Sequence, residues 1–513
     1  TTDNSYVNQN TKTFVYMAFA DKREYAYWLD QSGNNNDWTS NQLTESDIMV
    51  DSPTNNFCTM NPLTHSSAAA YEQGNLRIET PNYPWSRGTF AVSSGKWYWE
   101  WTHHDGSYPT YSGICNDNRV PGGENHGVAN NQAWYGNTDG LLKNWNSSGW
   151  VNRTDLAIDD IIGIAVDLDN GSIKWYKNNT LVYTDSTLPA GEEITAMVAG
   201  TNDGTSGSGW GDITFNFGQD SSFAGFKTAQ GNQDSNEIGD FYYTPPTGFL
   251  ALCSKSLPDV DVIPSENFST VLWTGNETAR SIAVPFAPDF LWLKTRGATY
   301  SHYWMDNVRG QGNRLFSNST NAESNDSSAP TLTSTGFNLT NSTGYNSNNV
   351  ATVGWNWKAN GAGASNTEGS INTTKTSANV DAGFSMITYT GNGSSGATIG
   401  HGLSKAPELY IFKRRNTGGS DWIIWQAAMG DPTYVMYFTA NEVQREDVQY
   451  GGLATYPTAS VLTLGSNAHY NANNSTYICY AFHSVEGYSK VGTYKGNNNA
   501  NGPYVNTGFR PAF

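Results

Sequence analysis

The chain has 513 residues, which is enough for several domains. Its 46 Asp and Glu residues outnumber its 28 Lys and Arg residues, and the net charge of −18 argues against nucleic acid or an anionic membrane surface as a partner. Aromatic residues make up 13% of the chain, and there are 52 glycines. This profile predicts an all-β protein with many turns, and no apolar run is long enough for membrane insertion.

Four cysteines, Cys58, Cys115, Cys253 and Cys479, are scattered along the chain without a C-x-x-C pair. This spacing predicts no zinc site and favours four buried free thiols. A disulfide between Cys58 and Cys253 stays open as an alternative, because sequence alone cannot show that two residues approach each other. No cofactor is predicted.

Residues 1–65 are predicted to be an N-terminal lead-in, and residues 66–230 the first domain. In the run 95–101, Gly-Lys-Trp-Tyr-Trp-Glu-Trp, three tryptophans alternate with Lys96, Tyr98 and Glu100, which predicts a half-buried strand. The apolar run 161–168 ends in Asp169-Asn170-Gly171 and is followed by a second β-like run. Asn-Gly between two such runs predicts a hairpin, since both central residues favour positive φ.

The motifs GKWYWEW, DDIIGIAVDLDNGSIKWYKNN and ITFNFG resemble, in this order, those of a SPRY domain. The resemblance covers roughly 150 residues. It implies a two-sheet antiparallel β-sandwich that binds partners through its loops, and it implies no catalysis. Residues 231–266 follow as a connector, in which residues 249–253 could form one strand that closes the sandwich.

A stretch at 268–296 recurs at 384–415, and its opening recurs once more at 488–513. Each copy begins with an aromatic residue and Ser, and continues through a β-like run, Gly-containing turn residues and a proline. In the first two copies the proline starts the pattern Pro-acid-apolar-Lys, at 288–294 and 407–413. A sequence that repeats in this way predicts tandem units. We expect one β unit at 267–382, a second at 383–487, and the start of a third, truncated unit at 488–513.

The first of these units has a Gly-, Ser- and Asn-rich tail at 359–382, which is interpreted as a flexible linker or long surface loop. A strand should not end at its first residues, so Phe513 is interpreted as a truncation of a longer protein. Serial β units behind a SPRY-like domain resemble the tail-fibre and tail-spike proteins of bacteriophages. The resulting fold class is all-β: a SPRY-like antiparallel β-sandwich followed by tandem β-sandwich-like repeats.

Candidate catalytic and metal patterns are better explained by structure. The G-x-G-x-x-G at Gly391, Gly393 and Gly396 does not open a helix, as a dinucleotide site requires, and is interpreted as a turn. His103 and His104 are adjacent on a predicted strand and would point to opposite faces, so they could not easily bind one ion. We therefore predict no catalytic residue, no metal site and no enzymatic activity.

Aromatic residues in the loops of the first domain are the candidate ligand contacts. Flat rings near Asn and Asp side chains suit a partner that is polar with an apolar face, such as a sugar or another protein. The alternative is that the rings anchor long loops to the sandwich. The residues proposed for testing are Tyr108, Tyr111, Trp134 and Trp210.

The expected function is adhesion: a virion tail-fibre or tail-spike protein, extracellular, that binds a host-surface receptor, with a polysaccharide or other glycan favoured over a protein. The resemblance implies contacts with other virion proteins and a homotrimer. One alternative is a non-adhesive virion protein, such as a head fibre, decoration or connector. A polysaccharide depolymerase and a cellular SPRY scaffold are weaker alternatives.

Overall fold

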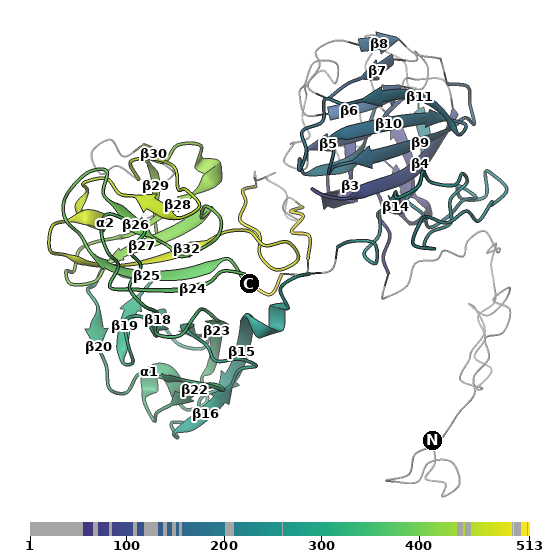
Figure 1. Cartoon of the computed structure of the whole chain (residues 1–513). Coiled ribbons are helices and arrows are strands. Elements are labelled where there is room, and N and C mark those ends of the chain that lie inside the picture. Colours follow the sequence, from purple (N-terminus) through teal and green to yellow (C-terminus); the bar gives the residue numbers. More distant parts are fainter. Residues whose placement is uncertain are drawn as a thin grey trace, which may run out of the picture. The chain divides into compact units, whose positions relative to one another are not determined.

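The structure of the chain is a computed structural model, and it divides into two compact units, Thr1–Leu257 and Pro258–Phe513. The residues that the structure describes are 55–64, 70–81, 85–105, 110–116, 132–136, 141–145, 150–152, 156–200, 210–258, 260–438, 445–446, 453–494, 496, 504–509 and 511–513. They form antiparallel sheets with a few short helical turns, so the predicted all-β class is confirmed (Figure 1). Within these residues, no helix has both the length and the apolar character needed to cross a membrane.

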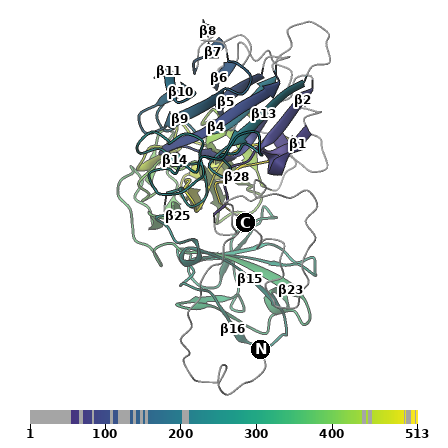
Figure 2. The ribbon, with the colours of Figure 1, turned by 90° about the vertical axis from the view of Figure 1, so that its right-hand side faces the viewer.

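The first unit is a sandwich of two antiparallel sheets that share one core. The larger sheet has the order β1-β2-β13-β4-β9-β10-β11, with β14 beside β4, and Figures 1 and 2 show β4, β9 and β10 side by side. Its strands are β1 Ala70–Glu72, β2 Arg77–Pro81, β13 Trp210–Asn216, β4 Lys96–Asp105, β9 Ile161–Asp167, β10 Ser172–Lys177, β11 Thr180–Asp185 and β14 Leu250–Ala251. The second sheet, in its spatial order, is β3 Trp85–Val92, β12 Ile194–Gly200, β5 Thr110–Asn116, β6 Gln132–Gly136, β7 Leu141–Lys143 and β8 Trp150–Asn152. The described residues of this unit also include the 3₁₀ turns η3 Pro62–Thr64 and η4 Gln73–Asn75.

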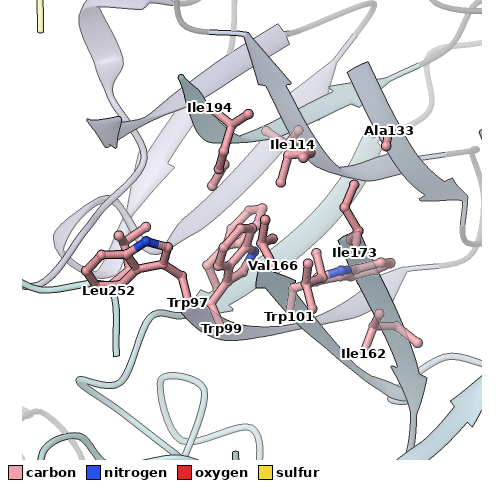
Figure 3. Packing of buried hydrophobic residues seen from close by; sticks show 14 of the residues in the cluster. Trp97, Trp99, Trp101, Ile114, Ala133, Ile162, Val166, Ile173, Ile194 and Leu252 are labelled. Carbon is pink, nitrogen blue, oxygen red and sulfur yellow. The ribbon is translucent and has the colours of Figure 1, made fainter. Parts of the chain in front are cut away.

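Strand β4 carries the three alternating tryptophans that the sequence pattern singles out. Trp97, Trp99 and Trp101 are buried and face Ile114 and Ile194 of the opposite sheet, which confirms the predicted apolar face (Figure 3). The expectation of a half-buried strand is wrong, because Tyr98 and Glu100 on the other face are buried as well.

The connector supplies the cover for this second face. Phe241, Phe249 and Ala251 pack with Tyr98, and β14 pairs with β4 in parallel. Phe57, from the predicted lead-in, joins the same cluster. The expected strand within residues 249–253 does close the sandwich, as β14, whereas Phe57 and Phe241 complete its core from outside the predicted bounds of 66–230.

All four cysteines are buried and free, as predicted. Phe57 and Cys253 face each other in an isolated antiparallel bridge, so the two chain segments do meet. Cys58 nevertheless packs in the core between the two sheets, whereas Cys253 packs in the cluster under the connector. Neighbouring residues on an extended chain point to opposite sides, which separates these two thiols.

The predicted hairpin joins β9 to β10, with Asp167 opposite Ser172. The loop is longer than the two-residue turn that Asn-Gly suggests, and of residues 168–171 only Gly171 has positive φ, at 66°. A Cβ at Gly171 would lie 2.2 Å from the carbonyl oxygen of Leu188, so glycine is required there. The Asp167 carboxylate accepts hydrogen bonds from the backbone and side chain of Asn170, at 3.0 and 2.9 Å.

The described residues of the second unit form two large sheets and two small ones. The first large sheet, in its spatial order, is β15 Phe268–Thr274, β23 Ala351–Trp357, β17 Phe290–Thr295, β18 Tyr303–Asp306, β19 Asn313–Phe316 and β20 Ser324–Asn325. Its small partner is β16 Arg280–Ala283, β22 Gly336–Leu339 and β21 Thr331–Thr333. The second large sheet is β24 Lys375–Asn379, β25 Phe384–Thr390, β32 Thr476–Phe482, β27 Leu409–Arg414, β28 Trp422–Gln426, β29 Tyr434–Tyr437 and β30 Arg445–Glu446. Its small partner is β26 Thr398–Gly400 and β31 Val461–Thr463. The short helical turns are η5 Pro264–Glu266, α1 Thr343–Asn346, η6 Ala427–Met429 and α2 Ala468–Asn471.

The two large sheets have corresponding strand orders, since β15-β23-β17-β18-β19-β20 matches β25-β32-β27-β28-β29-β30. Their registers match as well. Phe268 and Phe290 both lie opposite Trp357, and Phe384 and Leu409 both lie opposite Phe482. The correspondence follows from the repeated sequence.

Each large sheet is apolar on both faces. In β17, Leu291 and Leu293 face the small sheet, whereas Phe290 packs in a cluster shared with the other large sheet. Across this shared cluster the rings of Trp304 and Trp422 lie 4.8 Å apart between centroids. The two large sheets therefore pack directly against each other.

Two expectations for this unit need correction. The tail 359–382 is not simply a linker or surface loop, because β24 pairs with β25 and Ile371 is buried in the core of the second large sheet. The β-like run predicted from Tyr488 is not a strand: among the described residues of 488–513 only the bridge Val485↔Ser489 occurs. The alternating residues there favour a strand, but none of the described strands pairs with this segment.

Candidate functional site

The four aromatic residues proposed as ligand contacts have different positions. Tyr108 lies outside the described residues. Trp134 lies in β6 of the second sheet, and Trp210 is the first residue of β13 in the larger sheet. Both therefore belong to strands and not to the loops in which the sequence analysis placed them. Tyr111 is 4% exposed and packs with Cys115, Met197 and Ala199. Tyr111 therefore has a packing role, and ligand contact at the set stays a prediction.

His103 and His104 point to opposite faces of β4, as predicted. His103 lies beside Trp101, whereas the His104 ring stacks on Phe226 with a centroid distance of 3.7 Å. His104 Nε2 is 2.9 Å from Thr214 Oγ1, and burial lowers the pKa of His104 although the carboxylates of Asp212 and Asp159 oppose this. No cluster of three or more metal-ligating side chains occurs in the part of the chain that the structure describes.

Glu100 is a buried carboxyl group that the sequence analysis places on a solvent face. Its oxygens accept hydrogen bonds from the backbone N–H groups of Tyr242 and Tyr243, both at 2.8 Å, and from Asn216 at 3.2 Å. Burial raises the pKa of Glu100 to about 7, and these hydrogen bonds partly offset the effect. The contacts hold the connector on the sheet, so Glu100 is a structural group with a titration near neutral pH.

The repeated Pro-acid-apolar-Lys motif also has a structural role in both copies. Asp289 accepts a hydrogen bond from Ala359 N at 2.8 Å, and Glu408 accepts one from Ser484 N at 3.0 Å. Each of these N–H groups lies two residues beyond the central strand of its sheet, β23 or β32. The Lys294 ammonium donates to Tyr300 O at 2.5 Å. The motif therefore fastens loops to strands.

A hollow of about 710 Å³ opens between the two large sheets and the C-terminal segment. We call it the aromatic groove. The first large sheet contributes Phe268, Phe290, Trp292 and Trp357, and the second contributes Phe384, Leu409, Ile411 and Phe482. Tyr488, Phe509 and Phe513 line the remaining side. Its volume falls in the range of ligand sites, which is roughly 300–1,000 Å³, and its walls are mainly apolar.

The rings at the groove are closely packed on one side and open on the other. Phe513 lies 5.4 Å from Trp355 and from Trp357, and 5.6 Å from Trp292, between ring centroids. Phe513 itself remains 65% exposed. The groove is therefore an unfilled continuation of the cluster between the two sheets.

A buried ionic network lies beside this cluster and joins the two large sheets. Arg309 Nε donates to Asp306 Oδ2 at 2.6 Å, and Tyr480 Oη donates to the same oxygen at 2.7 Å. Arg309 also pairs with Glu323 at 3.1 Å, and Glu323 accepts two hydrogen bonds from Arg415 at 2.9 and 2.7 Å. Because the charges are paired and hydrogen-bonded, the network is a joint between sheets.

The sequence analysis did not predict the groove, although two apolar runs in the sequence indicate it. Phe290-Leu291-Trp292-Leu293 and Leu409-Tyr410-Ile411-Phe412 are continuous apolar runs without alternation. Such runs are typical of strands that are buried on both faces. They could have predicted a second packing partner for each large sheet.

Residues 263–513 match the model of a family described as a domain of unknown function (DUF7483). No curated protein matches the sequence. Among solved structures, the chain is similar to the SPRY domain of human HERC1, at 17% identity over 30% of this chain and 96% of that one, with a TM-score of 0.25. It is also similar to stonustoxin, at 16% identity over 31% and 27%, and to the PSpry domain of TRIM65, at 13% identity over 31% and 89%, each with a TM-score of 0.25. At these identities the likeness concerns the fold alone.

Proposed function

We propose that the chain is part of a bacteriophage tail fibre or tail spike that binds a receptor on the host surface. The observation that supports this most is the serial arrangement: a β-sandwich is followed by two β units with corresponding strand order and register. Serial β units are a way to build an extended scaffold from repeated sequence. A glycan is the proposed receptor class, and other virion proteins are the proposed neighbours.

The proposed contacts in the first unit are the aromatic residues Tyr108, Trp134 and Trp210. An aromatic ring beside polar groups can stack on the apolar face of a sugar ring while the polar groups bind its hydroxyls. The acidic net charge of −18 suits a neutral or cationic receptor better than a highly anionic one.

The test is binding of the purified chain to a panel of bacterial cells and to their purified surface polysaccharides. Sedimentation first establishes its oligomeric state, for which a trimer is the expectation. We expect saturable binding to one strain, and at least a tenfold weaker affinity for the Trp134→Ala, Trp210→Ala double variant. Tyr494→Ala is the matched control, since Tyr494 is 70% exposed in the second unit.

Other outcomes would favour other functions. Binding to no strain by the verified oligomer would favour a non-adhesive virion role, such as a head fibre, decoration or connector. Shortening of the bound polysaccharide on incubation would identify a depolymerase.

A further inference from the structure

Corresponding positions of the three sequence copies meet at the aromatic groove. The first aromatic residue of each copy is Phe268, Phe384 or Tyr488, and all three line the groove. Two residues after the shared proline stands Phe290, Leu409 or Phe513, and these three line it as well. Each of the three copies therefore places the same two positions of the motif at the groove.

Two of the three copies contribute a complete large sheet to this site. In each sheet, the two lining positions lie on either side of the last residue of β23 or β32. Phe268 and Phe290 both pair with Trp357, and Phe384 and Leu409 both pair with Phe482. The third copy contributes its two lining residues without a sheet among the described residues. Two walls of the groove are therefore sheets, whereas the wall from the third copy consists of irregular chain.

The groove also continues an interface that is already formed. The two large sheets pack through Phe290, Trp304, Trp422 and Tyr480, and Phe290 and Tyr480 lie 4.9 Å apart between ring centroids. Beyond these buried rings, Trp292 and Ile424 are only partly buried and line the groove. Apolar surface of this kind gains free energy when a second apolar surface covers it.

We propose that the aromatic groove is the docking site for a third β unit of the same kind as the two beside it. The occupant is a large sheet with one strand that carries apolar side chains on both faces, as β17 does in the first large sheet. Its first residue takes the place that Phe513 occupies, and its next inward-facing residue covers Trp292 and Ile424. Three large sheets would then share one aromatic centre.

The first experiment extends the chain in register. Because Phe513 corresponds to Phe290, a copy of residues 291–383 is joined directly after Phe513. Accessibility of the groove is measured by the rate at which a thiol reagent modifies Ile424→Cys. We expect the added unit to lower this rate at least tenfold, while the rate at Leu272→Cys, on an exposed position outside the groove, stays unchanged.

A second experiment needs no folded extension. A fluorescein-labelled peptide with the sequence of residues 288–296 is titrated into the unextended chain and followed by fluorescence anisotropy. We expect saturable binding that weakens at least tenfold for the Trp292→Ser variant, with the thermal unfolding midpoint of that variant recorded to confirm folding. A peptide with serine at the positions of Phe290 and Trp292, but with Leu291 and Leu293 kept, should not bind.

The proposal is overturned if the extension leaves Ile424→Cys as reactive as before and the peptide does not bind. It is also overturned if protection of that thiol rises with the concentration of the unextended chain, because a second copy would then be the occupant. Protection by a fatty acid, without protection by extension or peptide, would instead identify a small apolar ligand. None of these readouts depends on receptor binding.

Discussion

The protonation of Glu100 makes the packing of the connector on its sheet depend on pH. Its pKa in the folded chain is about 7, above the ordinary value of 4.5, because burial disfavours the charged carboxylate. Between these two values the folded state holds a proton that the unfolded state lacks. This contribution to stability is therefore complete below about pH 4.5 and is lost as the pH rises to about 7.

The first prediction concerns this group. The difference in pKa corresponds to about 3 kcal/mol of stability, and it should be visible as weaker hydrogen-exchange protection of residues 241–251 at pH 8 than at pH 5, after correction for intrinsic rates. Glu100→Gln should remove this pH dependence. At pH 8 the amide cannot accept from both Tyr242 and Tyr243, so the variant should be less stable by about 1–3 kcal/mol. An unchanged pH dependence in the variant would mean that another group titrates.

The second prediction concerns the four cysteines. All are buried, and burial raises the pKa of Cys58 to about 11, so little reactive thiolate exists near neutral pH. We expect no reaction with a thiol reagent in the native chain and four reactive thiols after denaturation without reductant. Two reactive thiols after denaturation would instead indicate a disulfide.

At the scale of elements, one buried asparagine in each of the two sequence repeats holds the turn that follows the first strand, and both asparagines lie in the second unit. Asn471 accepts from Asn392 N at 3.0 Å, and its amide donates to Ser394 O and Gly465 O, both at 2.9 Å. Asn346 makes the corresponding contacts with Asn276 N, Thr278 O and Thr340 O. The side chain thus replaces strand pairing at the point where the chain leaves β15 or β25.

The third prediction follows from these contacts. Asn471→Ala removes the side-chain partner of three backbone groups, and we expect a loss of about 3 kcal/mol in the free energy of unfolding, at about 1 kcal/mol for each hydrogen bond. Asn346→Ala should cost about the same, since its contacts correspond. Asn473→Ala, at an exposed position of the same loop, is the control and should change stability by less than about 0.5 kcal/mol in urea titrations. Equal effects at 471 and 473 would contradict this role.

At the scale of the whole molecule, the second unit depends on a joint between its two large sheets. The joint combines the aromatic cluster with the buried network of Asp306, Arg309, Tyr480, Glu323 and Arg415. Removal of one charge would leave its partner buried and uncompensated, which is a larger penalty than loss of the pair.

The fourth prediction tests this joint. Arg309→Leu leaves the Asp306 carboxylate unpaired, and we expect a loss of about 3–5 kcal/mol, with hydrogen-exchange protection falling in both large sheets. The double variant Asp306→Asn, Arg309→Leu should recover part of this loss, because no charge stays buried alone. Lys405→Leu, at an exposed position, serves as the control. A loss of protection confined to the first large sheet would show that the sheets are not coupled through this network.

Much of the local structure could be predicted from sequence. The apolar face of β4, the hairpin between β9 and β10, and the matching strands that begin at Phe268 and Phe384 all follow patterns within a few residues of each other. The tail at 359–382 could not be predicted, because its composition has no alternation and β24 forms only beside the free edge of β25. Of the candidate contacts, the burial of Tyr111 depends on β12, far along the chain.

The sequence by itself determined the all-β class, the alternating faces of single strands and the repeated stretch. The reason is that the two-residue alternation of side chains in a strand is visible within a few residues of sequence. The tertiary structure alone decided what covers each face. Tyr98 and Glu100 are buried by a connector more than a hundred residues away in the chain, and Cys58 and Cys253 lie on opposite sides of one bridge. The aromatic groove likewise exists only where three distant copies of one motif meet, since burial is a sum over neighbours that local sequence does not specify.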